Sequence, residues 1–225
     1  MKIRLRNRLR MCALLSLLLA SGMQWAQAQT YRVWFQFRAG MDGAAPLAGL
    51  VSDPNGHLYG TTSSDGAFDS GVVFKISAPH KETVLHSFTG SGGDGEYPLA
   101  GLVRDAAGNL YGTTANGGVY GGACGGFGCG TVFKVNSAGK EIVLHRFTGS
   151  PDASTPYAGL VRDEAGNLYG TTFSGGQYGF GTVFEINKDG DESVLYSFNP
   201  NNGDAAFPYG GCLLYTSDAA DDLTR

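Results

Sequence analysis

The sequence lacks the features that most directly identify an activity. Charged residues make up only 16% of its 225 residues, and the motifs GxSxG, HExxH and the P-loop are absent. Paired carboxylates and the alternating oxygen ligands of a calcium loop are absent as well. Glycine pairs are frequent, but no helical pattern follows them to supply the dipole of a phosphate site. The sequence therefore predicts no catalytic site, no metal site and no cofactor, and it leaves the ligand-binding residues unknown.

Basic residues are scarce in the part of the chain that is expected to fold. Residues 29–211 contain 10 Lys and Arg against 17 Asp and Glu, which gives a net charge of −7. No basic stripe remains to bind phosphates, so neither nucleic acid nor anionic lipid is expected as a partner.

Long apolar runs are missing too. The stretch Ala13 to Ala20 is far shorter than the roughly 20 residues of a membrane-spanning helix, so no integral membrane span is expected. It follows basic residues between Lys2 and Arg10 and precedes Ala26-Gln27-Ala28, whose small residues suit a signal peptidase. We interpret residues 1–28 as a Sec-type signal peptide cleaved between Ala28 and Gln29. The protein is thus expected to be exported and to be extracellular, periplasmic or at the cell surface.

The C-terminal segment differs from the rest of the chain. Residues 212–225 read CLLYTSDAADDLTR and share nothing with the text before them. They resemble the translation of a sequencing-library adapter, and we interpret them as a non-native tail. A divergent natural tail is the alternative.

What the chain does contain in quantity is glycine, with 36 residues, and aromatic side chains, at 12%. Glycine suits turns, and aromatic residues favour strands and fill a core. The composition therefore indicates a β-rich globular protein and not a disordered one.

One stretch occurs three times. It reads AGLVSDPNGHLYGTT at residues 48–62, AGLVRDAAGNLYGTT at 100–114 and AGLVRDEAGNLYGTT at 158–172. A fixed repeat of this length indicates an array of similar structural units. We place three units in a repeat domain over residues 29–211, and their ranges are 46–97, 98–155 and 156–207.

Each unit contains four short segments of strand-forming residues separated by turns. In the second unit these segments are 99–104, 110–114, 131–136 and 141–147. Asp, Asn and Gly between the first and second segments, and between the third and fourth, are typical of tight turns. The other two connections are longer, and in an up-and-down meander they emerge at the same edge. We predict an all-β fold made of four-stranded antiparallel meanders, with any binding surface at the long-loop edge.

The unit resembles known repeats. The text around AGLVRDAAGNLY is similar to the inner hairpin of NHL-type β-propeller blades. More closely, AGLVRDAAGNLYGTTANGG followed by GTVFKVNSAGKEIVLHRFTG is similar to the GloVer tandem repeat of bacterial "choice-of-anchor" surface proteins. That resemblance covers residues 30–211. It implies an exported repeat protein with an interchangeable C-terminal anchor and no established activity.

The number of units implies an incomplete ring. Residues 31–37 align with the fourth strand of a unit, so we expect a lone strand there with Gln36 at the position of His86 and His145. Propellers close with about four to eight blades. The chain is therefore expected to form a β-propeller-like array of about three full blades, to which the remaining repeats of a longer chain would add. A β-solenoid is the weaker alternative.

Few residues break the repeat symmetry. Cys124 and Cys129 lie in an insertion of the second unit, and in an exported chain we expect them to form a disulfide. His86, His145 and Tyr196 occupy matching positions, which we interpret as a half-buried aromatic site on an outer strand.

Two functions remain open. The leading hypothesis is a non-catalytic scaffold or interaction module with an unknown surface or extracellular partner. The alternative is an exported propeller enzyme, a polysaccharide or small-molecule lyase or hydrolase with its site on the ring axis. An enzyme is expected to break the repeat symmetry near that axis, and the cysteine loop is the main asymmetry, which favours the module.

Overall fold

The structure, a computed structural model, describes residues 32–212. Residues 32–34 belong to one compact unit and residues 35–212 to another, and the fold described below is that of the second. The predicted signal peptide with its cleavage between Ala28 and Gln29 lies outside the described residues. So do Tyr31 and all of the predicted tail except Cys212. Within residues 32–212, no helix is long and apolar enough to cross a membrane.

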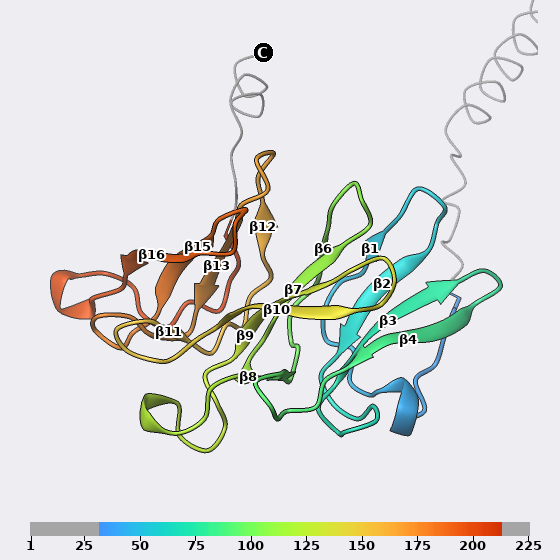
Figure 1. Ribbon diagram of the computed structural model, residues 1–225, viewed down its shortest axis with the longest axis horizontal. Coiled ribbons are helices and arrows are strands. Elements are labelled where there is room, and N and C mark those ends of the chain that lie inside the picture. Colours follow the sequence, from blue (N-terminus) through green and yellow to red (C-terminus); the bar gives the residue numbers. More distant parts are fainter. Residues whose placement is uncertain (1–31, 213–225) are drawn as a thin grey trace, which may run out of the picture. The chain divides into compact units, whose positions relative to one another are not determined.

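Three antiparallel sheets of four strands each make up the described fold (Figure 1). Sheet 1 contains β1 (Val51–Ser52), β2 (Leu58–Thr62), β3 (Val72–Ser77) and β4 (Lys81–Ser87). Sheet 2 contains β6 (Val103–Arg104), β7 (Leu110–Thr114), β9 (Thr131–Val135) and β10 (Glu141–Arg146). Sheet 3 contains β12 (Val161–Arg162), β13 (Leu168–Thr172), β15 (Thr182–Ile186) and β16 (Glu192–Ser197). Strand order follows the chain within each sheet, so the predicted all-β meander is confirmed and is consistent with an incomplete propeller-like array.

Smaller elements lie in the long loops. They are two ribbons, β5 (Gly95–Glu96) with β8 (Asn116–Gly117) and β11 (Ala153–Ser154) with β14 (Ser174–Gly175), and three 3-10 turns, η1 (Gly40–Asp42), η2 (Gly122–Cys124) and η3 (Pro200–Asn202). Each ribbon joins a loop between two units to the loop between the second and third strands of the later unit. Both sets of long loops therefore meet at one edge, as the sequence predicted. We call it the long-loop edge, and it comprises residues 63–70, 89–97, 115–130, 148–155, 173–181 and 199–207.

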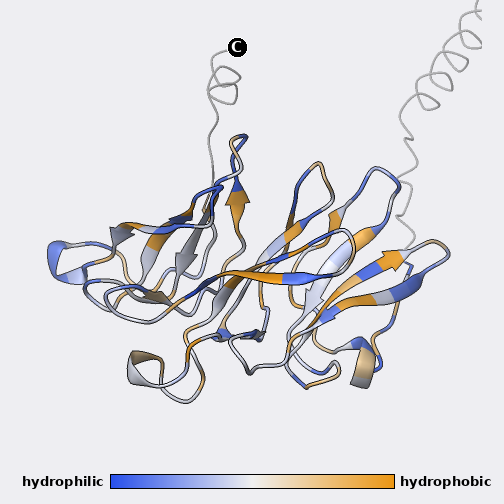
Figure 2. Ribbon diagram, viewed as in Figure 1, coloured by the Kyte–Doolittle hydropathy of each residue, from blue (hydrophilic) through white to orange (hydrophobic). Residues whose placement is uncertain are grey.

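The hydrophobic core lies between consecutive sheets. Phe88, which follows β4 of sheet 1, packs edge-on against Phe133 of β9, with ring centroids 5.0 Å apart. Phe147 and Phe184 repeat this contact between sheets 2 and 3 at 5.1 Å, and all four rings are fully buried. Figure 2 shows hydrophobic residues interspersed with hydrophilic ones along the strands. Each unit thus completes its core with its neighbour, as expected of a repeat protein.

The glycine of the repeated Leu-Tyr-Gly-Thr-Thr segment makes room for this core. A Cβ atom on Gly112 would lie 2.6 Å from Cζ of Phe133, and one on Gly170 would lie 2.5 Å from Cζ of Phe184. Such contacts are too short for any side chain. Glycine is therefore required on the second strand where it lies against the phenylalanine ring of the third strand.

The first threonine of the same segment joins consecutive units. Thr61 donates a hydrogen bond from Oγ1 to the carbonyl of Ala100 at 3.0 Å, and Thr113 donates to Ala158 at 3.1 Å. Thr171 donates in the same way to Gly210 at 2.9 Å. The start of each unit is therefore held by the preceding sheet. The first strands are shorter than predicted, because β6 covers only Val103–Arg104 of the segment 99–104.

A register shift occurs at the same place in every sheet. In sheet 1, Val84 pairs with Phe74 and His86 pairs with Val73, so Leu85 is an extra residue in β4. Leu144 and Leu195 are the extra residues of β10 and β16. Such a bulge bends a strand and re-aims its side chains. It therefore determines the direction of the residue that follows, which is His86, His145 or Tyr196.

The prediction of a lone strand over residues 31–37 is wrong for the part that the structure describes. Residues 32–37 are not in a strand, and sheet 1 already has four strands of its own. Phe37 nevertheless packs on Phe74 at 4.9 Å, as Phe88 packs on Phe133. Phe35 lies edge-on to Phe37, as His86 does to Phe88. The counterpart of His86 is therefore Phe35, and not Gln36 as the alignment predicted.

Candidate functional site

The tight turns opposite the long-loop edge contain a repeated hydrogen-bond network. The carboxylate of Asp105 accepts bonds from the backbone N–H of Asn109 at 2.8 Å, from its Nδ2 at 2.7 Å and from the hydroxyl of Tyr111 at 3.0 Å. Burial alone would raise the pKa of Asp105, but these bonds outweigh it and lower the pKa. Asp53 and Asp163 make the matching contacts in the other units. These residues shape the turns, as the sequence predicted, and His57 takes the place of the asparagine.

A pocket of about 200 Å³ opens between the strands of sheet 2 and the tight turns of sheet 3. Lys134, Arg162 and Lys188 are among the residues that line it. The side chains of Lys134 and Arg162 lie over the ring of Tyr111, with Nζ and Cζ at 5.5 and 5.9 Å from its centroid. Both cations are therefore engaged by the aromatic face, which makes the pocket part of the inter-sheet packing.

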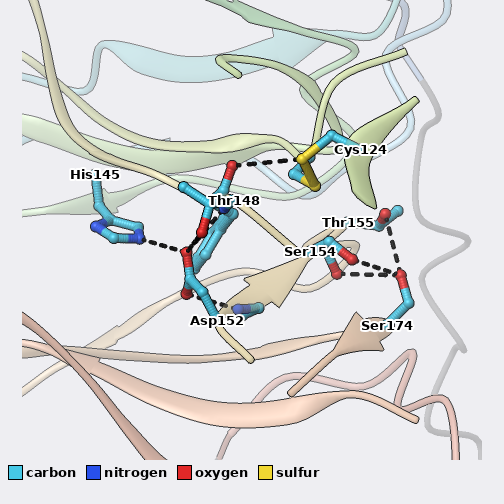
Figure 3. Close-up of a disulfide and its surroundings, with 10 residues drawn as sticks. Cys124, His145, Thr148, Asp152, Ser154, Thr155 and Ser174 are labelled. Atoms are coloured by element: carbon cyan, nitrogen blue, oxygen red, sulfur yellow. Dashed lines mark hydrogen bonds and ion pairs between the residues drawn. A yellow bond between two sulfur atoms is a disulfide. The ribbon is translucent and has the colours of Figure 1, made fainter. Parts of the chain in front are cut away.

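The long-loop edge is less uniform. In the second unit, Cys124 and Cys129 form a disulfide with an S–S distance of 2.02 Å (Figure 3). Cys129 is buried in the core between sheets 2 and 3, and its carbonyl accepts a bond from the N–H of Thr155. The disulfide therefore ties the insertion 121–129 to the packed part of the molecule.

Aromatic side chains are exposed in all three loops between the second and third strands. Phe127, inside the disulfide loop, is 74% exposed. Phe68 in the first loop and Tyr178 in the third are 57% and 43% exposed. Exposed aromatic residues are enriched at protein interfaces, where they lose water on binding. The long-loop edge is thus the surface of the described residues best suited to contact a partner.

Two polar clusters lie between consecutive sheets. The first, which we call junction A, contains His86 of β4, Asp94 of the following loop and Glu141 of β10. The second, junction B, contains His145, Asp152 and Glu192 in the matching positions. Within each junction, one potential ligand atom from each residue lies within 4.8 Å of the other two. Among the residues that the structure describes, these are the groups that could hold a metal ion.

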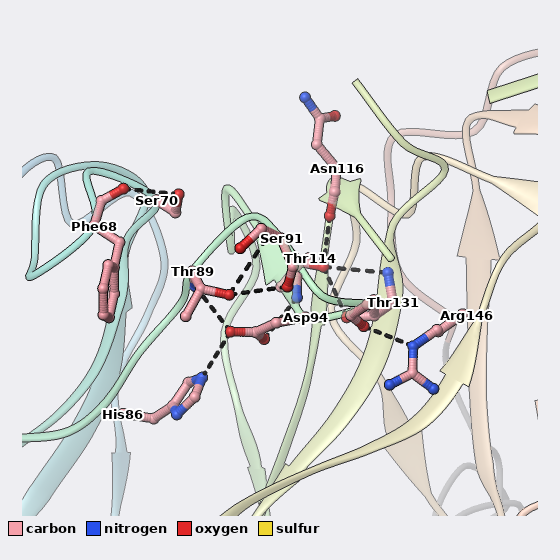
Figure 4. A network of polar contacts seen from close by, with 12 residues as sticks. Phe68, Ser70, His86, Thr89, Ser91, Asp94, Thr114, Asn116, Thr131 and Arg146 are labelled. Atoms are coloured by element: carbon pink, nitrogen blue, oxygen red, sulfur yellow. Dashed lines mark hydrogen bonds and ion pairs between the residues drawn. The ribbon is translucent and has the colours of Figure 1, made fainter. Parts of the chain in front are cut away.

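Backbone contacts fix the aspartate of each junction. Asp94 accepts bonds from the N–H groups of Thr89 at 2.8 Å and Gly95 at 2.6 Å (Figure 4). Asp152 is held in the same way by Thr148 and Ala153. Burial would raise the pKa of both carboxyls, but the adjacent histidine and these amides lower it. The aspartates are therefore ionised and oriented toward the imidazoles.

The glutamate of each junction is different. Burial raises the pKa of Glu141 and Glu192, and the neighbouring Asp94 and Asp152 raise it further. Glu82 occupies the same place in sheet 1, where burial and Asp42 raise its pKa to about 6. Phe35 stands there in place of histidine, so this first junction has carboxyl groups without an imidazole.

The sequence did not predict these clusters. It placed His86 and His145 at an aromatic position, and no spacing motif connects them with glutamates about 50 residues later. The available signal was the recurrence of a glutamate as the first or second residue of each fourth strand, at Glu82, Glu141 and Glu192.

Comparison with known proteins supports the repeat. The sequence profile of the family described as Gloeobacter/Verrucomicrobia repeat matches residues 23–220, and a search of curated proteins finds no match. The matched region contains all three sheets and both junctions. The chain therefore belongs to the Gloeobacter/Verrucomicrobia repeat family.

Proposed function

We propose that the chain is exported and acts as a scaffold or interaction module at the cell surface, with the long-loop edge as its contact surface. The observation that carries this proposal is the exposed aromatic side chain in each of the three loops between the second and third strands, namely Phe68, Phe127 and Tyr178. The signal-like sequence of residues 1–28 supports export, as does the cysteine pair at the same edge.

The last strand of sheet 3, β16, supports a second contact, with further repeats of a longer chain. Leu195 and Tyr196 of β16 are 52% and 47% exposed. Their counterparts in β4 and β10 are half-buried against the next sheet along the chain. A fourth sheet would cover β16 as sheet 2 covers β4. The sequence of the gene in its source genome tests this proposal, which fails if no further repeat is encoded after Gly211.

We make no proposal for the alternative of a lyase or hydrolase at the ring axis. Along the second strands, the repeated hydroxyls of Thr61, Thr113 and Thr171 each already donate to a carbonyl of the next unit. The recurrence of these threonines is therefore explained by the hydrogen bonds that join consecutive units, and it does not require a bound substrate.

The contact surface can be tested by co-sedimentation of the exported protein with purified bacterial cell envelopes. The variant carries Phe68→Ser, Phe127→Ser and Tyr178→Ser together. We expect the bound fraction to fall about tenfold or more, because aromatic anchors dominate interface energies. A control variant, Glu164→Ser with Ala165→Ser, changes exposed residues of a tight turn and is expected to bind normally. Equal loss in both variants, or in neither, would refute the long-loop edge as the contact surface.

A further inference from the structure

Junctions A and B contain polar atoms that the fold itself does not satisfy. Nε2 of His86 and Oε1 of Glu141 are buried, and neither has a hydrogen-bond partner among the described residues. In junction B the same is true, within residues 32–212, of Nε2 of His145 and Oε1 of Glu192. Buried polar groups are normally paired, so a recurring pair of orphaned atoms requires an explanation such as an ion.

The distances within the junctions suit metal ligands better than hydrogen bonds. Nε2 of His86 lies 3.5 Å from Oδ2 of Asp94, and His145 lies 3.5 Å from Asp152 (Figures 3 and 4). A hydrogen bond between these atoms would be about 2.7–3.2 Å long. Two ligands bound to one tetrahedral Zn²⁺ at about 2.0–2.1 Å lie about 3.3 Å apart. Only a small adjustment would therefore place an ion between the two side chains.

The charge of the junctions also favours a cation. Each gathers two partly buried carboxyl groups and a partly buried imidazole, and the aspartate is held as an anion by backbone amides. A divalent ion would compensate the aspartate and the glutamate together. One imidazole nitrogen with two carboxylate oxygens is a donor set for a transition-metal ion, whereas Ca²⁺ and Mg²⁺ prefer oxygen alone.

We propose that junctions A and B each bind one divalent transition-metal ion of the Zn²⁺ type, which bridges consecutive sheets of the repeat. In junction A the ligands are Nε2 of His86, Oδ2 of Asp94 and Oε1 of Glu141. In junction B they are the matching atoms of His145, Asp152 and Glu192. Since two ligands come from one unit and the third from the next, the ion fastens neighbouring repeats to each other.

The two junctions are not equal. Arg146, at the end of β10 (Figure 4), donates from Nε to the carbonyl of Gly93 at 2.6 Å. Its positive charge acts on Glu141. Ser197 occupies the corresponding position beside junction B. A nearby guanidinium disfavours a bound cation, so junction B is expected to have the higher affinity.

The ends of the array provide built-in comparisons. At the first junction, Phe35 supplies no ligand to join Asp42 and Glu82. At the last, the hydroxyl of Tyr196 donates to Oδ2 of Asp204 at 2.5 Å, so a proton satisfies the carboxylate there. The proposed sites are therefore confined to the two junctions with histidine.

The proposal is tested by isothermal titration of ZnCl₂ into the exported protein in a Cys212→Ser background, which removes the one free thiol among the described residues. We expect two bound ions per chain. Glu141→Gln and Glu192→Gln should each remove one ion, with affinity at the altered junction lower by more than about 100-fold, since even outer-shell changes cost 10–100-fold. Glu82→Gln is the matched control and should leave both ions bound.

A gain-of-function variant separates metal binding from general damage. Phe35→His adds an imidazole beside Asp42 and Glu82 and should raise the stoichiometry from two ions to three. Co²⁺ in place of Zn²⁺ provides a second readout, because visible absorption bands report an imidazole and carboxylate coordination sphere. Zinc binding that is absent, or that is unchanged in the double variant Glu141→Gln with Glu192→Gln, would overturn the proposal. Either result would leave a proton-bridged polar network as the explanation.

Discussion

Two aspartates recur in every unit, one in the tight turn and one between consecutive sheets, and their surroundings differ sharply. Asp105 in the turn has a donor for each oxygen, and the donors belong to its own unit. Asp94 is held by backbone amides, but it faces an imidazole and a glutamate whose buried atoms find no hydrogen-bond partner among the described residues. Stabilising the fold is therefore a sufficient explanation for Asp105, whose oxygens all have hydrogen-bond donors. It is not sufficient for Asp94, whose neighbours have buried atoms that are unpaired within residues 32–212.

The largest effect is expected when the complete network is broken. Asp105→Ala removes the acceptor for Asn109 and Tyr111 and leaves partly buried donors unpaired. We expect the free energy of unfolding to fall by about 2–3 kcal/mol, measured by urea denaturation at pH 7. Glu164→Ala, in the exposed part of the equivalent turn, should change it by less than about 0.5 kcal/mol. Similar small effects in both variants would show that the turn network contributes little.

The second prediction concerns the covalent link at the long-loop edge. Replacing both Cys124 and Cys129 by serine removes a disulfide between residues that are only five positions apart in the sequence. For so short a loop, the chain-entropy model gives a decrease of at most about 2 kcal/mol in the free energy of unfolding. The free energy of unfolding should therefore fall less than with Asp105→Ala. Proteolysis near Phe127 should become faster, since the loop tip is released. Alkylation of both thiols in the exported wild-type protein, detected by mass spectrometry, would contradict the disulfide.

The dependence of stability on pH tests whether the carboxyl group of Asp105 stabilises the folded protein. Hydrogen bonds lower the folded-state pKa of Asp105 below its ordinary value of 3.8. Its contribution to stability is therefore complete above pH 3.8 and is lost as the pH falls through the lower folded value. Acid unfolding followed by circular dichroism should be less steep for Asp105→Ala than for the wild type. An unchanged slope would mean that this carboxyl does not titrate with unfolding.

The sequence was sufficient for the architecture and insufficient for the junctions. Local turn chemistry and strand-forming residues predicted the segment 110–114 as found in β7, because both act over a few residues. The first strand was overestimated: β6 covers only Val103–Arg104, and Ala100, earlier in the predicted segment, instead accepts a hydrogen bond from Thr61 of the preceding unit. The junctions depend on a bulge at Leu85 and on packing between units, which bring Asp94 and Glu141 together across 47 positions of sequence. No local sequence pattern predicts that these two residues lie close together.

The smallest expected effect concerns Glu82, at the junction that lacks a histidine. The contribution of Glu82 to stability should depend on pH in the opposite direction to that of Asp105. Burial and Asp42 raise the pKa of Glu82 from 4.5 to about 6, the opposite direction to Asp105. Below pH 4.5 the carboxyl is protonated in both the folded and unfolded states and imposes no penalty. Between pH 4.5 and 6 the folded protein holds a proton that the unfolded chain has lost, so stability falls as the pH rises.

Glu82→Gln removes that charge while keeping the shape of the side chain. We therefore expect a small gain in the free energy of unfolding above pH 6 that disappears below pH 4.5, measured by thermal unfolding across this range. A loss of stability above pH 6 would show that Glu82 has a favourable partner. The contrast between Asp105, whose carboxylate has hydrogen-bond donors, and the glutamates between sheets, whose buried Oε1 atoms have none among the described residues, would then not hold for Glu82.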